Sequence, residues 1–268
     1  MDIQFQVEQF LQAVADCIFA GIPQKQPEKE TLQKCKIVSH RGEHDNQSVL
    51  ENTIPAFDLV HDRGIWGIEL DIRWTKDLKP VVIHDPDCRR VFGTENIVNK
   101  ETFKELKTRL PFLPSLEEII QKYGKKLHLM VELKKEHYPR PRYQSDLLMD
   151  LFSNLEPMHD FHFISLSPEM FQHVGFVPNN ALLPVAEFNF REFSELALQN
   201  GYGGLTGHYL LMNQEMVKKH EQAGQKVGTG FPSSGNCLFR ELNRGVEWVF
   251  SNQAVKLQTI CDSILQNQ

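Results

Sequence analysis

At residues 68–72 the chain reads Ile68-Glu69-Leu70-Asp71-Ile72, a strict alternation of aliphatic and acidic side chains. Because successive side chains of a β-strand point to opposite faces, this stretch predicts a strand with both carboxylates on one face. We expect the aliphatic face to pack under the helices of an α/β barrel. Two carboxylates that point together into a barrel mouth repel each other and lose hydration, which favours a bound cation or proton. An amphipathic strand with a solvated polar face explains the pattern about equally well.

The next predicted strand runs antiparallel to this one. Only residues 76–79 separate Thr75 from Pro80, whereas a parallel crossover needs about a dozen residues. A hairpin about Leu78 brings His84 to roughly the level of Asp71, because they lie at similar distances from the turn centre. Groups that are distant in sequence therefore converge at one place.

The rest of the chain alternates strand-like and helix-like segments. Pro55 follows Asn52-Thr53 in a helix-start pattern, and Gly64 ends that helix. Repeated strand and helix units favour a parallel sheet, and eight of them would close a TIM (β/α)8 barrel with the hairpin at its mouth. The predicted strands are Ile37-Val38, Gly67 to Trp74, Pro80 to His84, Leu127 to Lys134, Phe161 to Leu166, Leu182 to Glu187, Gly203 to Thr206, Val227 to Phe231 and Trp248 to Ser251.

The beginning of the chain has a different pattern. Apolar residues recur at three- and four-residue intervals between Phe5 and Phe19, which predicts an amphipathic helix packed on the main body. Residues 24–31 are rich in Gln, Lys, Glu and Pro and predict a linker. We therefore expect an N-terminal helix and linker over residues 1–35 and one barrel domain over residues 36–268.

Composition narrows the class of protein. The net charge of −6 provides no global basic field, so we expect no nucleic-acid partner and local binding of any anionic small-molecule substrate. The five cysteines are scattered without a CxxC pair, which favours reduced thiols. The start of the chain lacks the features of a signal peptide, and no apolar run approaches the ~20 residues of a membrane span. We expect a cytoplasmic protein without a transmembrane segment, and the oligomeric state stays open.

A second predicted strand ends with the same alternation of aliphatic and charged residues. In Val131-Glu132-Leu133-Lys134, Glu132 and Lys134 share one face and the aliphatic residues share the other. A third carboxylate completes an oxygen-rich site suited to Mg²⁺ or Ca²⁺, and Lys134 supplies a positive charge for phosphate. A structural ion pair between Glu132 and Lys134 is the alternative.

Two histidines follow predicted strands, where barrels keep their catalytic groups. His40-Arg41 ends the first strand and His84-Asp85 ends the hairpin. Histidine exchanges protons near neutral pH, and the arginine fork matches phosphate oxygens. We interpret the remaining histidines as surface or core residues by default, among them His44, His61, His128, His159 and His208.

A series of short motifs carries a family signature. In chain order they are His40-Arg41-Gly42, Glu51-Asn52-Thr53, Glu69-Leu70-Asp71, Thr75-Lys76-Asp77, His84-Asp85, Leu113-Pro114-Ser115-Leu116-Glu117-Glu118 and Val131-Glu132-Leu133-Lys134. In this order they resemble the glycerophosphodiester phosphodiesterase (GDPD) family. The resemblance covers Ile37 to Lys134 and then thins.

The resemblance implies a TIM barrel with metal-dependent cleavage of glycerophosphodiesters to glycerol phosphate and an alcohol. The cofactor that it implies is a divalent cation, Mg²⁺ or Ca²⁺. By the matched motifs, Glu69, Asp71 and Glu132 are the metal ligands. His40 and His84 form the acid/base pair, with His40 favoured as base and His84 as acid.

The matched motifs also imply substrate contacts by Arg41 and Lys134. Glu51 matches a family position too, where it contacts substrate or orients Arg41. The loop over residues 43–50 is longer than is usual in the family. Near the end of the chain, Thr229-Gly230-Phe231-Pro232 and Ser251-Asn252-Gln253-Ala254 replace a Trp-Thr pair and a Thr-Asp-x-Pro ending. Phe231 either replaces the missing aromatic wall of the alcohol pocket or is a core residue.

Three functions are compatible with these features. The favoured one is a glycerophosphodiesterase that acts on deacylated phospholipids. A phospholipase D-like enzyme acting on lysophospholipids or sphingolipids would need an exposed apolar rim. A non-catalytic barrel that binds phosphorylated ligands is disfavoured, because the chain retains the two histidines and the three carboxylates of the predicted site.

Overall fold

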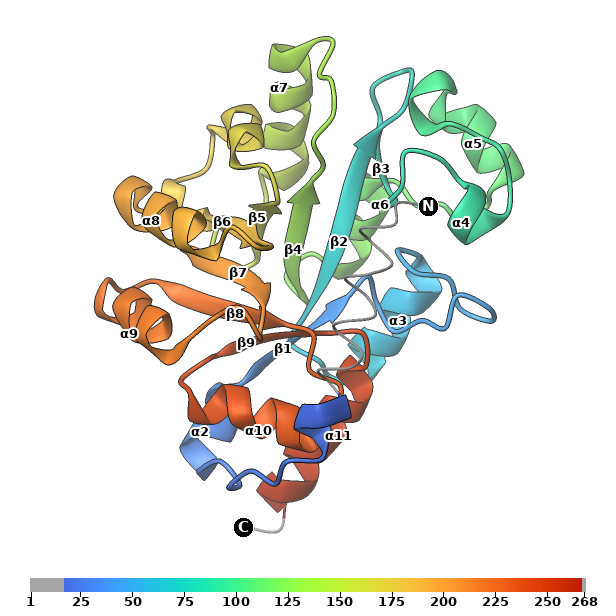
Figure 1. Cartoon of the computed structure of the whole chain (residues 1–268). Helices are drawn as coiled ribbons and strands as arrows, with labels where there is room; N and C mark the ends of the chain where they lie inside the picture. Colours follow the sequence, from blue (N-terminus) through green and yellow to red (C-terminus); the bar gives the residue numbers. More distant parts are fainter. Residues whose placement is uncertain (1–16, 267–268) are drawn as a thin grey trace.

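Parallel strands close into a barrel in the computed structural model, which describes residues 17–266 (Figure 1). The strands follow the order β1-β9-β8-β7-β6-β5-β4-β2 around the ring, and β1 also pairs with β2, which closes it. The predicted TIM-barrel fold is therefore confirmed. The bounds of the parallel strands are β1 (Lys36–His40), β2 (Gly67–Trp74), β4 (His128–Leu133), β5 (Phe161–Ser165), β6 (Leu182–Ala186), β7 (Gly204–His208), β8 (Lys226–Gly230) and β9 (Trp248–Ser251).

Helices surround the barrel on its outer side (Figure 1). No described helix combines the length and apolar character that a bilayer crossing requires. The α-helices are α2 (Lys29–Lys34), α3 (Ile54–Asp62), α4 (Arg89–Phe92), α5 (Phe103–Arg109), α6 (Leu116–Tyr123), α7 (Pro141–Phe152), α8 (Phe190–Asn200), α9 (Gln214–Gln222), α10 (Gly235–Asn243) and α11 (Ala254–Gln266), and the 3-10 helices are η1 (Val98–Lys100), η2 (Pro168–Val174) and η3 (Asn179–Ala181).

The alternation in β2 divides its side chains between two cores. Ile68, Leu70 and Ile72 are at most 1% exposed and belong to the apolar layer between the strands and the surrounding helices. Each buried aliphatic side chain contributes roughly 1.5–3 kcal/mol relative to an exposed one. A separate apolar cluster that includes Val38 and Met130 fills the barrel interior. The acidic side chains of β2 are therefore directed away from the helix layer and toward the barrel axis.

A hairpin extends β2 beyond the barrel mouth. The short strand β3 (Pro80–Val82) pairs antiparallel with β2, with Ile72 opposite Val82. Leu78 adopts a φ of 59° in the connecting turn. The Ile83 N–H donates to the Asp71 carbonyl at 2.9 Å, so His84 lies within one residue of the level of Asp71.

The strand β3 ends two residues before the predicted end at His84. The reason is that the His84 carbonyl accepts a hydrogen bond from the Arg73 side chain (Nε to O, 2.7 Å) instead of joining the ladder. The following segment packs a small core of its own, which includes Val81, Ile83 and Cys88. This core supports the chain on either side of His84.

The described N-terminal segment lies along α10. Residues 1–16, which hold most of the predicted amphipathic helix, lie outside the described residues. Asn236 Nδ2 donates to the Ala20 carbonyl at 2.7 Å, and Asn243 Nδ2 donates to the Lys25 carbonyl at 2.8 Å. The boundary between residues 35 and 36 stays a prediction.

Candidate active site

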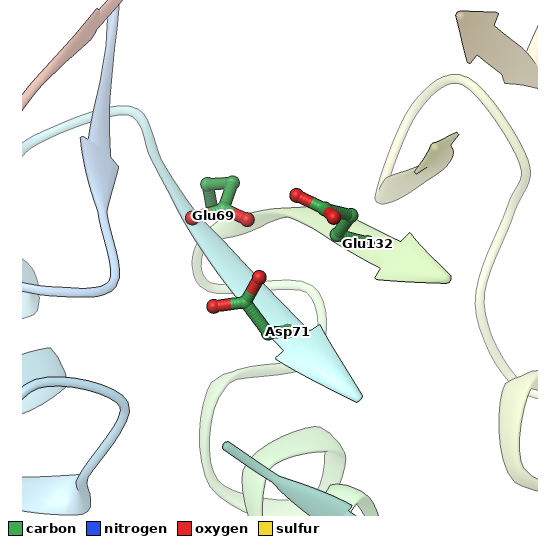
Figure 2. Close-up of side chains that lie close together, drawn as sticks. All are labelled: Glu69, Asp71 and Glu132. Atoms are coloured by element: carbon green, nitrogen blue, oxygen red, sulfur yellow. The ribbon is translucent and has the colours of Figure 1, made fainter. Parts of the chain in front are cut away.

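Two neighbouring strands bring three carboxylates together. In the β2–β4 pairing Asp71 lies opposite Glu132, and Glu69 lies two residues earlier on β2. One oxygen of each residue lies within 4.8 Å of the others, and all three residues are buried. Figure 2 shows the carboxylates of Glu69 and Asp71, from β2, and of Glu132, from β4, gathered on one side of the strands. The structure thus brings together the three predicted metal ligands.

Two cations lie against this cluster. Lys134 Nζ is 2.7 Å from Asp71 Oδ1 and 2.5 Å from Glu132 Oε1. Arg41 Nε is 3.2 Å from Asp71 Oδ2. The ion pair between Glu132 and Lys134, considered above as an alternative, is therefore present within the carboxylate cluster. Two positive charges face three acidic groups, so a negative charge remains if all three are ionised.

These surroundings shift the pKa values of Glu69 and Asp71 in opposite directions. Burial, followed by repulsion from Asp71 and Glu132, raises the pKa of Glu69 well above its usual range. Burial alone would also raise the pKa of Asp71, but Lys134 and Arg41 hold it well below its usual value. Glu69 therefore holds its proton to a higher pH than an ordinary glutamate does, and a bound cation would compete with that proton.

The donor set fits a hard divalent cation. Glu69 Oε1 is buried and has no hydrogen-bond partner among the described residues, whereas Asp71 Oδ1 is paired with Lys134. An unsatisfied buried oxygen costs about 1–3 kcal/mol, and more when it is charged. Carboxylate oxygens are the ligands that Mg²⁺ and Ca²⁺ prefer. Glu69, Asp71 and Glu132 could hold such an ion.

His40 lies at the end of β1 beside Glu69. Its Nε2 is 3.7 Å from Glu69 Oε2, and its Nδ1 is 2.6 Å from Asn252 Oδ1. Its ring also packs against Phe231, with centroids 4.6 Å apart. Burial, and then the charge of Arg41, lowers the pKa of His40 to about 3. The ring is therefore neutral near pH 7 and has a free lone pair on Nε2 when Nδ1 donates to the amide oxygen.

Arg41 is held in the left-handed region of the backbone, with a φ of 60°. Its N–H donates to the Glu69 carbonyl at 3.0 Å. Gly42, with a φ of +82°, allows close packing on α3, because a Cβ there would lie 2.7 Å from the Cβ of Ala56. The His40-Arg41-Gly42 motif thus turns the chain sharply and directs the guanidinium toward the carboxylates.

Asn52 is a site residue to which the sequence analysis gave no role of its own, although it lies in the helix-start pattern and in the motif Glu51-Asn52-Thr53. Its Nδ2 donates to Asp71 Oδ2 at 2.8 Å, and its backbone N–H donates to the Arg41 carbonyl at 2.8 Å. Its φ of 56° is unusual for a residue other than glycine, and asparagine tolerates it better than most. Left-handed backbone at both Arg41 and Asn52 is of the kind that clusters at functional sites.

His84 is anchored by the neighbouring residue Asp85. Its Nδ1 is 2.7 Å from Asp85 Oδ1, so the carboxylate accepts the Nδ1–H and leaves Nε2 for chemistry. Burial alone would raise the pKa of Asp85, but hydrogen bonds from His84 and Arg90 lower it. His40 and His84 are each anchored through Nδ1, by an amide and by a carboxylate respectively.

Glu51 lies between two arginines and is only 3% exposed. Its Oε1 accepts from Arg41 Nη1 at 3.0 Å, and Arg90 donates to both of its oxygens at 2.7 Å. Asn46 Nδ2 also donates to Oε2 at 2.8 Å. Sequence reasoning did not find Arg90 or Asn252.

The wall across from the carboxylates is apolar. Phe231 packs partly buried against the interior cluster that includes Ile164 and Phe250. Because it also contacts His40, it has features of both roles proposed for it, a pocket wall and a core residue. A Cβ on Gly230 would meet nothing closer than 3.7 Å, so the chain is not crowded there.

Comparison with known proteins places the site residues in a recognised region. Residues 40–158 match the model of the Glycerophosphoryl diester phosphodiesterase family. This match runs from the end of β1 to just beyond α7 and includes every site residue described above except those near the C-terminus, such as Phe231 and Asn252.

Curated relatives match over stretches of similar length. The glycerophosphodiester phosphodiesterase of Caldanaerobacter subterraneus subsp. tengcongensis is 36% identical over 113 residues, which are 38% of this chain and 46% of that protein. The enzyme of the same name from Bacillus altitudinis is 34% identical over 119 residues, 40% of this chain and 48% of that protein. The chain thus spans about half the length of the curated relatives it matches.

Solved structures match over the whole barrel. The glycerophosphodiester phosphodiesterase of Thermotoga maritima has a TM-score of 0.72 at 20% identity and covers 84% of this chain and 98% of its own. An Oleispira antarctica phosphodiesterase in complex with the product sn-glycerol-3-phosphate has a TM-score of 0.70 at 21% identity, with coverages of 85% and 96%. At these identities the similarity demonstrates a shared fold.

Proposed function

We propose that this chain belongs to the glycerophosphoryl diester phosphodiesterase family, whose model it matches over residues 40–158, and that it hydrolyses glycerophosphodiesters to glycerol phosphate and an alcohol with a divalent cation. The observation that carries this function is the gathering of Glu69, Asp71 and Glu132 within 4.8 Å. Two anchored histidines stand beside this cluster. Together these groups supply what phosphodiester cleavage requires: charge stabilisation, a base and an acid.

Electrostatic stabilisation comes from the chain and from the cation. A divalent cation held by the three carboxylates would act as a Lewis acid toward a non-bridging phosphate oxygen. Arg41 presents a fork that matches phosphate oxygens, and Lys134 adds a point charge. Lys134 also forms ion pairs with both Asp71 and Glu132. Glu51 acts by holding Arg41, because its oxygens already accept bonds from Arg41, Arg90 and Asn46.

Proton transfer is divided between the two histidines. His40 is neutral near pH 7 and its Nε2 lies on the side of Glu69, so it takes the proton of the attacking hydroxyl. That hydroxyl belongs either to water, which gives glycerol phosphate directly, or to the neighbouring glycerol carbon of the substrate, which gives a cyclic phosphate that water then opens. His84, oriented by Asp85, gives a proton to the departing alcohol. Each transfer is worth ~10²- to 10⁴-fold in rate.

A second substrate class has one observation in its favour. Phe188 is 68% exposed and Leu211 is 41% exposed. They follow the neighbouring strands β6 and β7, and the loops after barrel strands form the mouth. These side chains would provide an apolar rim for the acyl chain of a lysophospholipid, as a phospholipase D-like enzyme requires.

A substrate panel distinguishes these functions. Glycerophosphocholine, glycerophosphoethanolamine, glycerophosphoglycerol and lysophosphatidylcholine would each be incubated with Mg²⁺, Ca²⁺, Mn²⁺ or chelator. We expect release of glycerol phosphate from the deacylated substrates, and loss of release with chelator. Preferential cleavage of lysophosphatidylcholine would favour the phospholipase D-like function. Binding of glycerol phosphate without turnover of any substrate would favour the non-catalytic barrel.

The cellular setting follows from the proposed reaction. Glycerophosphodiesters are products of phospholipid deacylation, so the protein would act in lipid metabolism. We place it in the cytoplasm, since the cysteines within residues 17–266 form no disulfide bond. Fractionation of cells followed by immunodetection tests this location, and recovery from an oxidising compartment would contradict it.

A further inference from the structure

Arg90 occupies the centre of a charge network beside the site. Its Nη1 and Nη2 each donate a 2.7 Å hydrogen bond to Glu51, on Oε2 and Oε1 respectively. Its Nε donates to Asp85 Oδ2 at 2.6 Å. One guanidinium therefore joins a carboxylate from the loop after β1 to a carboxylate from the end of the hairpin.

Each of these carboxylates holds a group assigned to the reaction. Glu51 Oε1 accepts from Arg41 Nη1 at 3.0 Å, and Asp85 Oδ1 is 2.7 Å from His84 Nδ1. The network therefore runs in the order Arg41, Glu51, Arg90, Asp85 and His84, with the charges alternating in sign. The arginine that binds phosphate and the histidine that donates the proton share one support.

Loss of Arg90 would be costly because its partner Glu51 is buried. Glu51 is only 3% exposed, and a buried carboxylate that loses its partner is strongly destabilising. Without Arg90, Glu51 would depend on Arg41 and Asn46 for its hydrogen bonds. Glu51 would then draw the Arg41 guanidinium toward itself and away from Asp71.

All three guanidinium nitrogens of Arg90 donate hydrogen bonds. The two terminal nitrogens face one carboxylate while Nε faces the other, and a lysine ammonium cannot reproduce this fork. Within residues 17–266, the ion pairs of Arg90 are with Glu51 and Asp85. Its influence on the reacting groups is therefore indirect.

We propose that Arg90 is a positioning residue that sets Arg41 for phosphate binding and His84 for proton transfer at the same time. The role at His84 rests on the phosphodiesterase function proposed above. The role at Arg41 is measurable from phosphate binding alone, without turnover. The two roles therefore call for separate double-mutant cycles, since coupling appears as non-additive effects.

The first cycle measures the affinity for inorganic phosphate by calorimetry in the presence of saturating Mg²⁺. We expect Arg90→Ala to weaken binding by about tenfold, the loss of one charge-assisted hydrogen bond. The double variant Arg41→Ala with Arg90→Ala should bind within about twofold of Arg41→Ala alone, because Arg90 acts through Arg41. Full additivity of the two losses, or unchanged affinity in Arg90→Ala, would overturn this role.

The second cycle measures kcat on glycerophosphocholine. We expect Arg90→Ala to lower kcat by roughly 10²-fold, and to cause no further loss in a His84→Ala background. Because the Arg90 side chain is 39% exposed, added guanidinium can reach the vacated position, and we expect it to restore part of kcat in Arg90→Ala but none in His84→Ala. Additive kcat losses without rescue would refute the role at His84.

Arg89→Ala is the matched control. Arg89 precedes Arg90 in α4, is 61% exposed and pairs with Asp87 and Glu95 outside the network, so wild-type values are expected. Should Arg90→Ala fail to fold, Arg90→Lys retains the charge, and we expect it to show the same non-additivity at reduced amplitude.

The proposed function and the proposed role of Arg90 can be refuted separately. A wild-type protein that turns over no phosphodiester but shows the phosphate-binding coupling would refute the proposed function and support the role at Arg41. A wild-type protein that turns over substrate while both cycles are additive would refute the role of Arg90 alone.

Discussion

His40 Nδ1 lies 2.6 Å from Asn252 Oδ1, although the two residues are 212 positions apart in the chain. They meet because β1 and β9 are neighbours in the barrel, and His40 ends β1 while Asn252 directly follows β9. The amide accepts the Nδ1–H without adding charge. A neutral partner therefore fixes the ring while the pKa of His40 stays low, at about 3, through burial and the charge of Arg41.

Asn252→Asp should raise the pKa of His40, because a carboxylate favours the protonated ring. His40 must be neutral to act as a base. The acidic limb of the pH–activity profile should therefore move to higher pH, by about one unit. The pH profile of kcat/KM measures this shift. The exposed Asn200→Asp serves as control, and an acidic limb that does not move in Asn252→Asp would show that His40 is not the base.

The stabilising effect of Mg²⁺ should depend on pH. Burial and the neighbouring carboxylates raise the pKa of Glu69 above its value in the unfolded chain. Protonated Glu69 thus contributes stability at acidic pH, and this contribution is lost as pH rises through the folded-state value. A cation replaces the proton, so the Mg²⁺-induced rise in Tm should be larger near pH 8 than near pH 5, by about a few degrees. Equal rises measured by calorimetry at both pH values would contradict this.

Glu69→Gln and Asp71→Asn should differ in stability although both abolish turnover. Glu69 Oε1 has no hydrogen-bond partner within the described chain, so Glu69→Gln should leave the metal-free free energy of unfolding unchanged or raise it by about 1 kcal/mol. Asp71→Asn leaves Lys134 and Arg41 without a shared partner and should cost about 3 kcal/mol. Urea titration in chelator measures both, and equal destabilisation would refute the assigned charge balance.

Gly42→Ala should damage both the fold and phosphate binding. The residue has a φ of +82°, and the added methyl would lie 2.7 Å from the Cβ of Ala56, so we expect a loss of about 3 kcal/mol and displacement of Arg41. Gly93→Ala is the control, because its φ is +67° but nothing lies within 4 Å, and it should cost only about 1 kcal/mol. Similar losses in both variants by urea titration would show that Ala56 can move aside.

Local patterns were sufficient to predict the fold. The alternation in residues 68–72 specified which face of β2 would meet the helices, and β2 has the predicted bounds, Gly67–Trp74. The short connection over residues 76–79 required an antiparallel partner, and β3 pairs in that way. Such features depend on a few consecutive residues, so they can be predicted before any tertiary contact is known.

The supporting groups of the site were not predictable in the same way. The partnership of Asn252 with His40 depends on closure of the barrel, and the position of Arg90 depends on how the segment after the hairpin folds back onto Glu51. No local spacing encodes such contacts. The clustering of Glu69 with Asp71 could be predicted, because strand periodicity places both on one face of β2.

In the proposed reaction, the three carboxylates hold a cation that phosphodiester cleavage requires. The most direct test follows glycerophosphocholine by ³¹P NMR in the presence of the protein and Mg²⁺, before and after addition of excess chelator. We predict that a glycerol phosphate resonance grows with Mg²⁺ and stops growing with chelator. No product in either condition, or product formation at an undiminished rate in chelator and in Glu69→Gln, would contradict the claim.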